Sequence, residues 1–80
     1  MDRFEHCMLE FYWSQPSYTD SPTWKPSFTI FHADGRHESR VGGNAEITAA
    51  LNALGKEGWR ITSAVTTMNW ILWTLERKVG

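Results

Sequence analysis

The sequence predicts an α+β fold, a single antiparallel sheet of four to five strands with one amphipathic helix packed on one face. Three observations predict it: segments with the two-residue period of strands, one segment with the 3.6-residue period of a helix, and an Asp-Gly turn between two strand-like segments. The chain of 80 residues is long enough for one domain, 1–80. It is too short for an enzyme with an active site between two domains.

Residues 4–13 are the first predicted strand, because they are rich in aromatic side chains, contain no Gly or Pro and are almost continuously apolar. Residues 14–27 follow as a loop that contains three prolines together with Tyr18 and Trp24. Loops of this length are uncommon in small domains. Two roles stay open for it, a lid over a site or a plug whose aromatic side chains close the end of the core.

Residues 28–41 are predicted to form an inserted β-hairpin, because Asp34-Gly35 separates two alternating segments. A two-residue turn at this dipeptide would place His32 opposite His37 on the neighbouring strand. Side chains alternate across the pleat, so this register also decides which of them share a face. The predicted core face of the hairpin holds Phe28, Ile30, His32, His37, Ser39 and Val41.

The helix is predicted over residues 45–57, with Asn44 as its N-cap and Gly58 ending it. Its apolar side chains recur at the i, i+3, i+4, i+7 spacing of one buried stripe. That stripe consists of Ile47, Ala50, Leu51 and Leu54. We therefore expect an ordinary amphipathic helix lying on the sheet.

Two further strands are predicted over 59–66 and 70–78, and the last of them is apolar at both parities. Its apolar side chains are Trp70 and Leu72 in one direction, and Ile71, Trp73 and Leu75 in the other. A single helix covers only one face of a sheet, so the other face needs a separate cover. A second copy of the chain is the favoured cover, which predicts a homo-oligomer and first of all a dimer, and an apolar ligand is the alternative.

The composition of the chain indicates which classes of partner and which cellular compartment to expect. Hydrophobic residues make up 41% and charged residues 21% of the chain, which are globular proportions, and the net charge is -1. Because the charges are scattered, no basic face is predicted for nucleic acid. A single cysteine, Cys7, favours a reducing cytoplasm. No segment has the length of a signal peptide core or of a membrane span, so we expect no membrane association.

The run from Leu51 to Trp59, Leu-Asn-Ala-Leu-Gly-Lys-Glu-Gly-Trp, is followed by two strands, the second ending Leu75-Glu76-Arg77-Lys78. It resembles a family of short bacterial proteins classed as a domain of unknown function, whose signature is a helix ending in Leu-Gly-x-Glu-Gly-Trp. The match covers residues 45–78, and Phe4-Glu5 is similar to the start of the family's first strand. The resemblance implies a β-α-β-β core and a bacterial source, but no chemistry. Arg60 departs from the family, and the segment 14–41 is longer than its usual insertion.

His32 and His37 are the candidate catalytic residues, because opposed residues on antiparallel strands have Cβ atoms about 4.5–5.5 Å apart and two imidazoles at that distance can exchange protons. Asp34 or Arg36 would orient them or stabilise charge. The alternative interpretation is a pair of polar residues at an exposed hairpin end. No third ligand has a diagnostic spacing and no cofactor motif is present, so we predict neither a metal nor a cofactor.

Three functions are compatible with the sequence. The first is a binding module that holds an aromatic or polycyclic small molecule in a pocket lined by Tyr12, Trp13, Tyr18, Trp24, Arg36 and the two histidines. The second is a cofactor-free isomerase or cyclase that acts on such a molecule through acid–base catalysis. The third is a protein-interaction or inhibitory module that uses its exposed aromatic sheet face.

Overall fold

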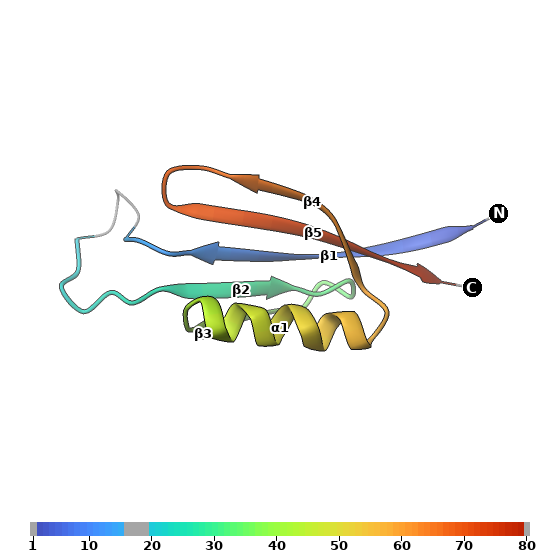
Figure 1. Cartoon of the computed structure of the whole chain (residues 1–80), viewed down its shortest axis with the longest axis horizontal. Helices are drawn as coiled ribbons and strands as arrows, with labels where there is room; N and C mark the ends of the chain where they lie inside the picture. Colours follow the sequence, from blue (N-terminus) through green and yellow to red (C-terminus); the bar gives the residue numbers. More distant parts are fainter. Residues whose placement is uncertain (1, 16–19, 80) are drawn as a thin grey trace.

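The computed structural model describes residues 2–15 and 20–79, and it has one antiparallel five-stranded sheet and one helix (Figure 1). This confirms the predicted α+β class. The elements in chain order are β1 (Arg3–Tyr12), β2 (Ser27–Phe31), β3 (His37–Val41), α1 (Asn44–Lys56), β4 (Arg60–Thr66) and β5 (Trp70–Val79). The strand order across the sheet is β3-β2-β1-β5-β4, and the molecule is elongated, 50 × 20 × 20 Å.

The two longest strands, β1 and β5, pair along their whole length in the interior of the sheet. Their register runs from Arg3 opposite Val79 to Tyr12 opposite Trp70. Both strands carry apolar side chains at both parities, which is typical of interior strands. The β2–β3 hairpin extends the sheet beyond β1, and β4 extends it beyond β5. The chain ends therefore meet in the middle of the sheet rather than at its edges.

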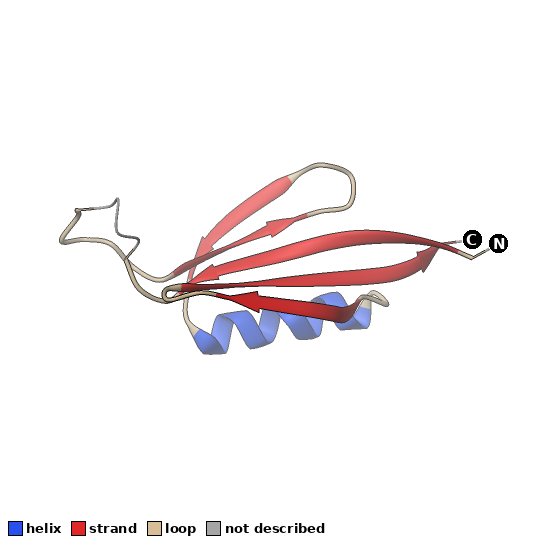
Figure 2. Ribbon diagram, turned by 90° about the horizontal axis from the view of Figure 1, so that it is seen from above, coloured by secondary structure: helices blue, strands red, loops and turns tan. Residues whose placement is uncertain are grey.

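The hydrophobic core lies on one face of this sheet. Leu9 of β1 is opposite Ile30 of β2, and Cys7 is opposite Leu75 of β5, so the register brings these side chains to a common face. Figures 1 and 2 show α1 running along the sheet on one side. The buried cluster combines strand, helix and loop residues, namely Cys7, Leu9, Phe11, Phe28, Ile30, Ile47, Ala50, Leu54, Trp59 and Leu75.

The ends of α1 depend on glycines and on one carboxylate. The N-cap is Gly43, so the prediction that Asn44 caps the helix was wrong by one residue. The reason is that the Glu46 side chain reaches back and accepts a hydrogen bond from the Gly43 N–H at 3.3 Å. This bond stabilises the start of the helix although the N-cap residue itself has no side chain. At the other end Gly58 has φ +93°, a conformation that favours glycine, and it turns the chain into Trp59.

The predicted hairpin exists, but its predicted register was wrong. The turn has three residues, and it is closed by a 2.7 Å hydrogen bond from the His32 N–H to the Arg36 carbonyl oxygen. Gly35 has φ +93°, as expected for a type I turn followed by a left-handed residue. Phe31 therefore faces His37, one residue away from the predicted pairing. A shift of one residue turns every side chain of β3 to the other face.

The corrected register separates the residues of the predicted hairpin face. Phe28 and Ile30 are buried as predicted, and they lie opposite Arg40 and Glu38. On β3 the prediction placed His37, Ser39 and Val41 on the core face. These three residues lie instead on the other face of the sheet, where Val41 is 66% exposed. The core face of β3 is consequently charged rather than mixed polar and apolar.

Candidate functional site

The predicted ligand-binding aromatics lie at one end of the sheet and the predicted catalytic residues at the other (Figure 1). Tyr12 is opposite Ser27 at the start of β2, whereas His32 directly follows the end of β2. Five residues of strand, roughly 16 Å, separate the two positions. The expected pocket that combines both groups is thus not formed within one copy of the chain.

Trp13 and Trp24 belong to the same end as Tyr12. Trp13 is 41% exposed, and its ring centroid lies 6.3 Å from that of Phe11. Trp24 is half-buried in the loop before β2, where its backbone N–H donates to the Ser21 carbonyl oxygen. Tyr18 lies outside the described residues. The proposal that the 14–27 loop forms a lid therefore concerns the aromatic end and not the hairpin tip.

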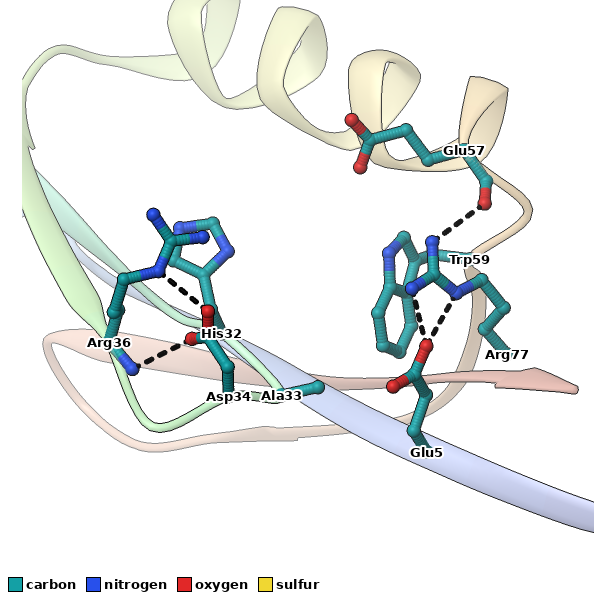
Figure 3. A pocket seen from close by; sticks show the side chains of 8 residues that line it. All are labelled: Glu5, His32, Ala33, Asp34, Arg36, Glu57, Trp59 and Arg77. Carbon is teal, nitrogen blue, oxygen red and sulfur yellow. Dashed lines mark hydrogen bonds and ion pairs between the residues drawn. The ribbon is translucent and has the colours of Figure 1, made fainter. Parts of the chain in front are cut away.

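A cavity of about 210 Å³ lies between the hairpin tip and the C-terminal end of α1, and Figure 3 shows its lining. It contains three predicted site residues, His32, Asp34 and Arg36. The sequence-based prediction missed the other side chains that define it, chiefly Arg77 and Trp59. The complete lining is Glu5, His32, Ala33, Asp34, Arg36, Glu57, Trp59 and Arg77.

Arg77 joins three parts of the chain at one wall of this cavity. Glu5 is opposite Arg77 across the β1–β5 pair, and its Oε1 accepts hydrogen bonds from Nε at 2.8 Å and from a terminal guanidinium nitrogen. The other terminal nitrogen donates to the Glu57 carbonyl oxygen at 3.1 Å, at the end of α1. The guanidinium carbon lies 4.4 Å from the ring centroid of Trp59. Each of the three guanidinium nitrogens thus donates a hydrogen bond to a neighbouring part of the chain.

Gly58 is favoured at this point by its backbone conformation, because a φ of +93° disfavours any side chain. A Cβ on it would be in ordinary van der Waals contact with Arg77, 3.4 Å from Cδ. Glu5, Gly58, Trp59 and Arg77 therefore lie together. Their contacts fix the end of the helix to the central strands, which is a structural role.

The opposite wall of the cavity is the hairpin tip. Asp34 accepts a 3.0 Å hydrogen bond from the Arg36 N–H and a 2.7 Å bond from its Nε, and the backbone bond is the main cause that holds the pKa of Asp34 below its ordinary value. Nε2 of His32 lies 3.0 Å from Oε1 of Glu38, whose other oxygen accepts from Arg40 at 2.9 Å. These two contacts, Arg40 first, lower the pKa of Glu38.

His37 makes none of these hydrogen bonds. It is opposite Phe31, where it is exposed and its ring centroid is 6.1 Å from that of Phe31. The predicted directly opposed histidine pair was therefore wrong, but His32 and His37 both line a second, open pocket at the hairpin tip together with Arg36 and Glu38. Among residues 2–15 and 20–79, no group of three or more His, Cys, Asp or Glu side chains is placed to hold a metal ion. Burial raises the pKa of the Cys7 thiol, which keeps it protonated.

The sheet face opposite the core carries accessible apolar side chains together with polar and charged ones such as Glu10, Thr29 and Thr74, and we call it the open sheet face. Met8 of β1 and Phe31 of β2 are opposite each other there and are 40% and 41% exposed. Half-buried Leu72 of β5 is opposite Val65 of β4, which is 54% exposed. The apolar members of the open sheet face are Phe4, Met8, Tyr12, Phe31, Val41, Val65, Trp70 and Leu72.

In comparisons with known proteins, no family model, curated protein or solved structure matches the chain. In the described part of the chain, α1 is too short and too polar to cross a membrane. The fold and its surfaces thus define a small α+β domain with two candidate sites, the open sheet face and the cavity beside Arg77.

Proposed function

We propose that the protein is an interaction module that binds a second copy of itself through the open sheet face. The observation that carries the proposal is the exposure of large apolar side chains on consecutive strands, from Phe4 at 46% to Val41 at 66%. A monomer rarely leaves this many large apolar side chains accessible on one face, here with polar side chains such as Glu10 and Thr29 among them. The proposal assumes that α1 covers the core face, so that the opposite face alone remains for a partner.

The size of the face allows a second copy as its cover. Strands of ten residues extend roughly 33 Å, and five strands span roughly 20 Å across the sheet. The face covers less than the roughly 660 Å² of that rectangle, because β2, β3 and β4 are shorter, and it corresponds to an interface below the ~800 Å² per partner of a standard one. Two such sheets packed face to face would lie about 10 Å apart with interdigitating side chains, the geometry of a β-sandwich.

The charges on this face are compatible with a symmetric contact. Glu76 accepts from Arg60 at 3.0 Å and lies 3.8 Å from His6, and Lys78 lies 3.3 Å from Asp2. These pairs lie toward the end of β1 and β5 where the termini meet (Figure 1). The region around Met8 therefore has charged residues on that side, as interfaces commonly have at their rim, and Glu10 lies on its other side along β1.

The mass of the protein in solution, measured by light scattering, tests the proposal. The wild type is expected to be an oligomer, and the paired substitutions Met8→Glu and Phe31→Glu are expected to reduce its mass by a factor of two or more. Thr48→Glu, on an exposed position of α1, is the matched control and should leave the mass unchanged. Circular dichroism verifies that each variant is folded. A wild type that stays monomeric at high concentration would overturn the proposal.

A second candidate function is the binding of a small planar, polar molecule in the cavity beside Arg77. The guanidinium of Arg36 and the ring of His32 lie at its hairpin wall, and Trp59 at the other (Figure 3). A volume of about 210 Å³ is below the range of drug-sized pockets, so a fragment-sized ligand is the class that fits. Titration of tryptophan fluorescence with aromatic acids and nucleobases tests it. Saturable quenching that Arg36→Ala abolishes would support it, and no response would exclude it for those ligands.

A further inference from the structure

The strand β4 is an edge strand with an unusual degree of exposure. It is paired with β5 on one side only in the sheet of described residues, and each of its residues from Arg60 to Thr66 is exposed. Ile61 is 49% and Val65 54% accessible, although both are β-branched apolar residues.

The other edge of the sheet, β3, carries the features that protect edge strands from further pairing. It has only five residues, and two of them, Glu38 and Arg40, are charged and paired with each other at 2.9 Å. In contrast, β4 has seven residues, and the run from Ile61 to Thr66 has no charge and no proline. Its single irregularity is the register shift between Ile61 and Ser63. The edge from Ser63 to Thr66 is therefore regular, uncharged and able to pair.

The turn at the end of β4 determines which backbone groups point outward. The Thr67 N–H donates to the Trp70 carbonyl oxygen at 2.9 Å, so these two residues form a hydrogen-bonded pair. Such pairs alternate in an antiparallel ladder, which makes Val65 and Leu72 the next hydrogen-bonded pair. Ala64 and Thr66 accordingly present their N–H and C=O groups to the outer side of β4. These are the groups that a further strand would use.

We infer that β4 pairs with β4 of a second copy of the chain, antiparallel and centred near Ala64, so that two sheets continue into one. The distribution of charge favours this occupant and this direction. In the antiparallel pairing Arg60 of one copy lies opposite Met68 of the other, and the two Arg60 residues are about 26 Å apart. A parallel pairing would instead bring the two arginines together. Ile61 and Val65 would gain neighbours from the second copy.

This interface is separate from the open sheet face, and it goes beyond the proposed function. A two-fold contact at an edge and a two-fold contact at a face can coexist on one chain, and they close as a tetramer when the two axes cross at right angles. The edge contact extends the sheet, whereas the face contact stacks two sheets. The two contacts can therefore be removed independently.

The test is the solution mass of Ala64→Pro beside that of Met8→Glu and the double variant. The Ala64 N–H points outward, so proline there removes no hydrogen bond of the sheet itself but blocks pairing with another strand. We expect Ala64→Pro to halve the mass of the wild type, Met8→Glu to halve it independently, and the combination to give a monomer. Thr48→Glu again serves as the control. Ala64→Lys, which opposes two like charges in the symmetric pairing, replaces Ala64→Pro if circular dichroism shows that the proline variant does not fold.

The outcomes separate the two interfaces. A wild-type mass for both Ala64→Pro and Ala64→Lys, with a reduced mass for Met8→Glu, would overturn the edge pairing and leave the face contact standing. The reverse result would overturn the face contact alone. Monomers throughout would overturn both. As positive support, Ala64→Cys should cross-link to a second copy with a short thiol-specific reagent, since the native Cys7 is only 3% exposed and does not compete.

Discussion

The two faces of the sheet differ sharply although they are built from alternate residues of the same strands. Leu9 is fully buried on the core face, and its neighbour Met8 is 40% exposed on the open sheet face. Likewise Ile30 is 4% and Phe31 41% exposed. Similar apolar side chains thus have different environments on the two sides of the sheet. Under the proposal made above, the apolar side chains of the open sheet face serve a partner and not the folding of a single chain.

The largest expected effect is a difference in the free energy of unfolding between a substitution on the core face and one on the open sheet face. Leu9→Ala should lower the free energy of unfolding by about 2–5 kcal/mol, because it removes a fully buried side chain from a packed cluster. Met8→Ala should cost the isolated monomer less than about 1 kcal/mol, because Met8 is already partly in water. Urea unfolding at a concentration where both variants are monomeric measures the difference. Equal losses for the two would contradict the assignment of faces.

A smaller effect is expected for the arginine that connects the helix end to the central strands. Arg77→Ala removes the contacts with Glu5 and Trp59 and should cost about 1–3 kcal/mol, between the values for exposed and fully buried ion pairs. Arg60→Ala removes the exposed pair with Glu76 on the open sheet face and should cost less than about 1 kcal/mol. The two variants are matched in chemistry, and thermal unfolding distinguishes them.

Alanine substitutions at Gly58 and Gly55 compare a conformationally restricted position with an accessible one. Gly58→Ala is expected to cost about 1–2 kcal/mol, because φ there is +93°. Gly55→Ala in the last turn of α1, where nothing lies within 4 Å of an added Cβ, should instead be neutral or stabilising. If both alanines had the same effect on the unfolding free energy, the strain at Gly58 would be disproved.

The smallest effect concerns pH. Asp34 and Glu38 have lowered pKa values in the folded protein, from the Arg36 backbone N–H and from Arg40 respectively. A lowered carboxyl pKa stabilises the folded state above the unfolded-state pKa, about 4, and that contribution is lost as pH falls through the folded pKa. The unfolding free energy should therefore decline below about pH 4.5. Glu38→Gln should make the decline shallower, as followed by urea titrations at several pH values.

The architecture could be predicted from the sequence because its signals are local. The stripe of Ile47, Ala50 and Leu54 has a helical period, and the apolar parities of residues 70–78 require an interior strand. The hairpin register could not be predicted, because Asp34-Gly35 fits both a two-residue turn and a three-residue turn with Gly35 in the left-handed region. One residue of difference was enough to remove the direct opposition of His32 and His37.

The cavity beside Arg77 was missed because its residues are distant in sequence. Glu5 and Arg77 are 72 positions apart, and only the register of β1 against β5 brings them together. A local signal did exist. Each is the charged residue at the end of an otherwise apolar row, Glu5 before Cys7 and Leu9, and Arg77 after Leu75. Charged residues that continue a buried row usually find a partner, and this rule would have suggested the pair.

Sedimentation equilibrium of the wild type beside the Met8→Glu, Phe31→Glu double variant, across a range of concentrations, tests the central claim that the open sheet face is an interface. The account predicts a concentration-dependent oligomer for the wild type, and a smaller species for the double variant at every concentration where the wild type is assembled. Identical mass distributions for two folded proteins would contradict it, and the apolar side chains of the open sheet face would then have no partner in a second copy.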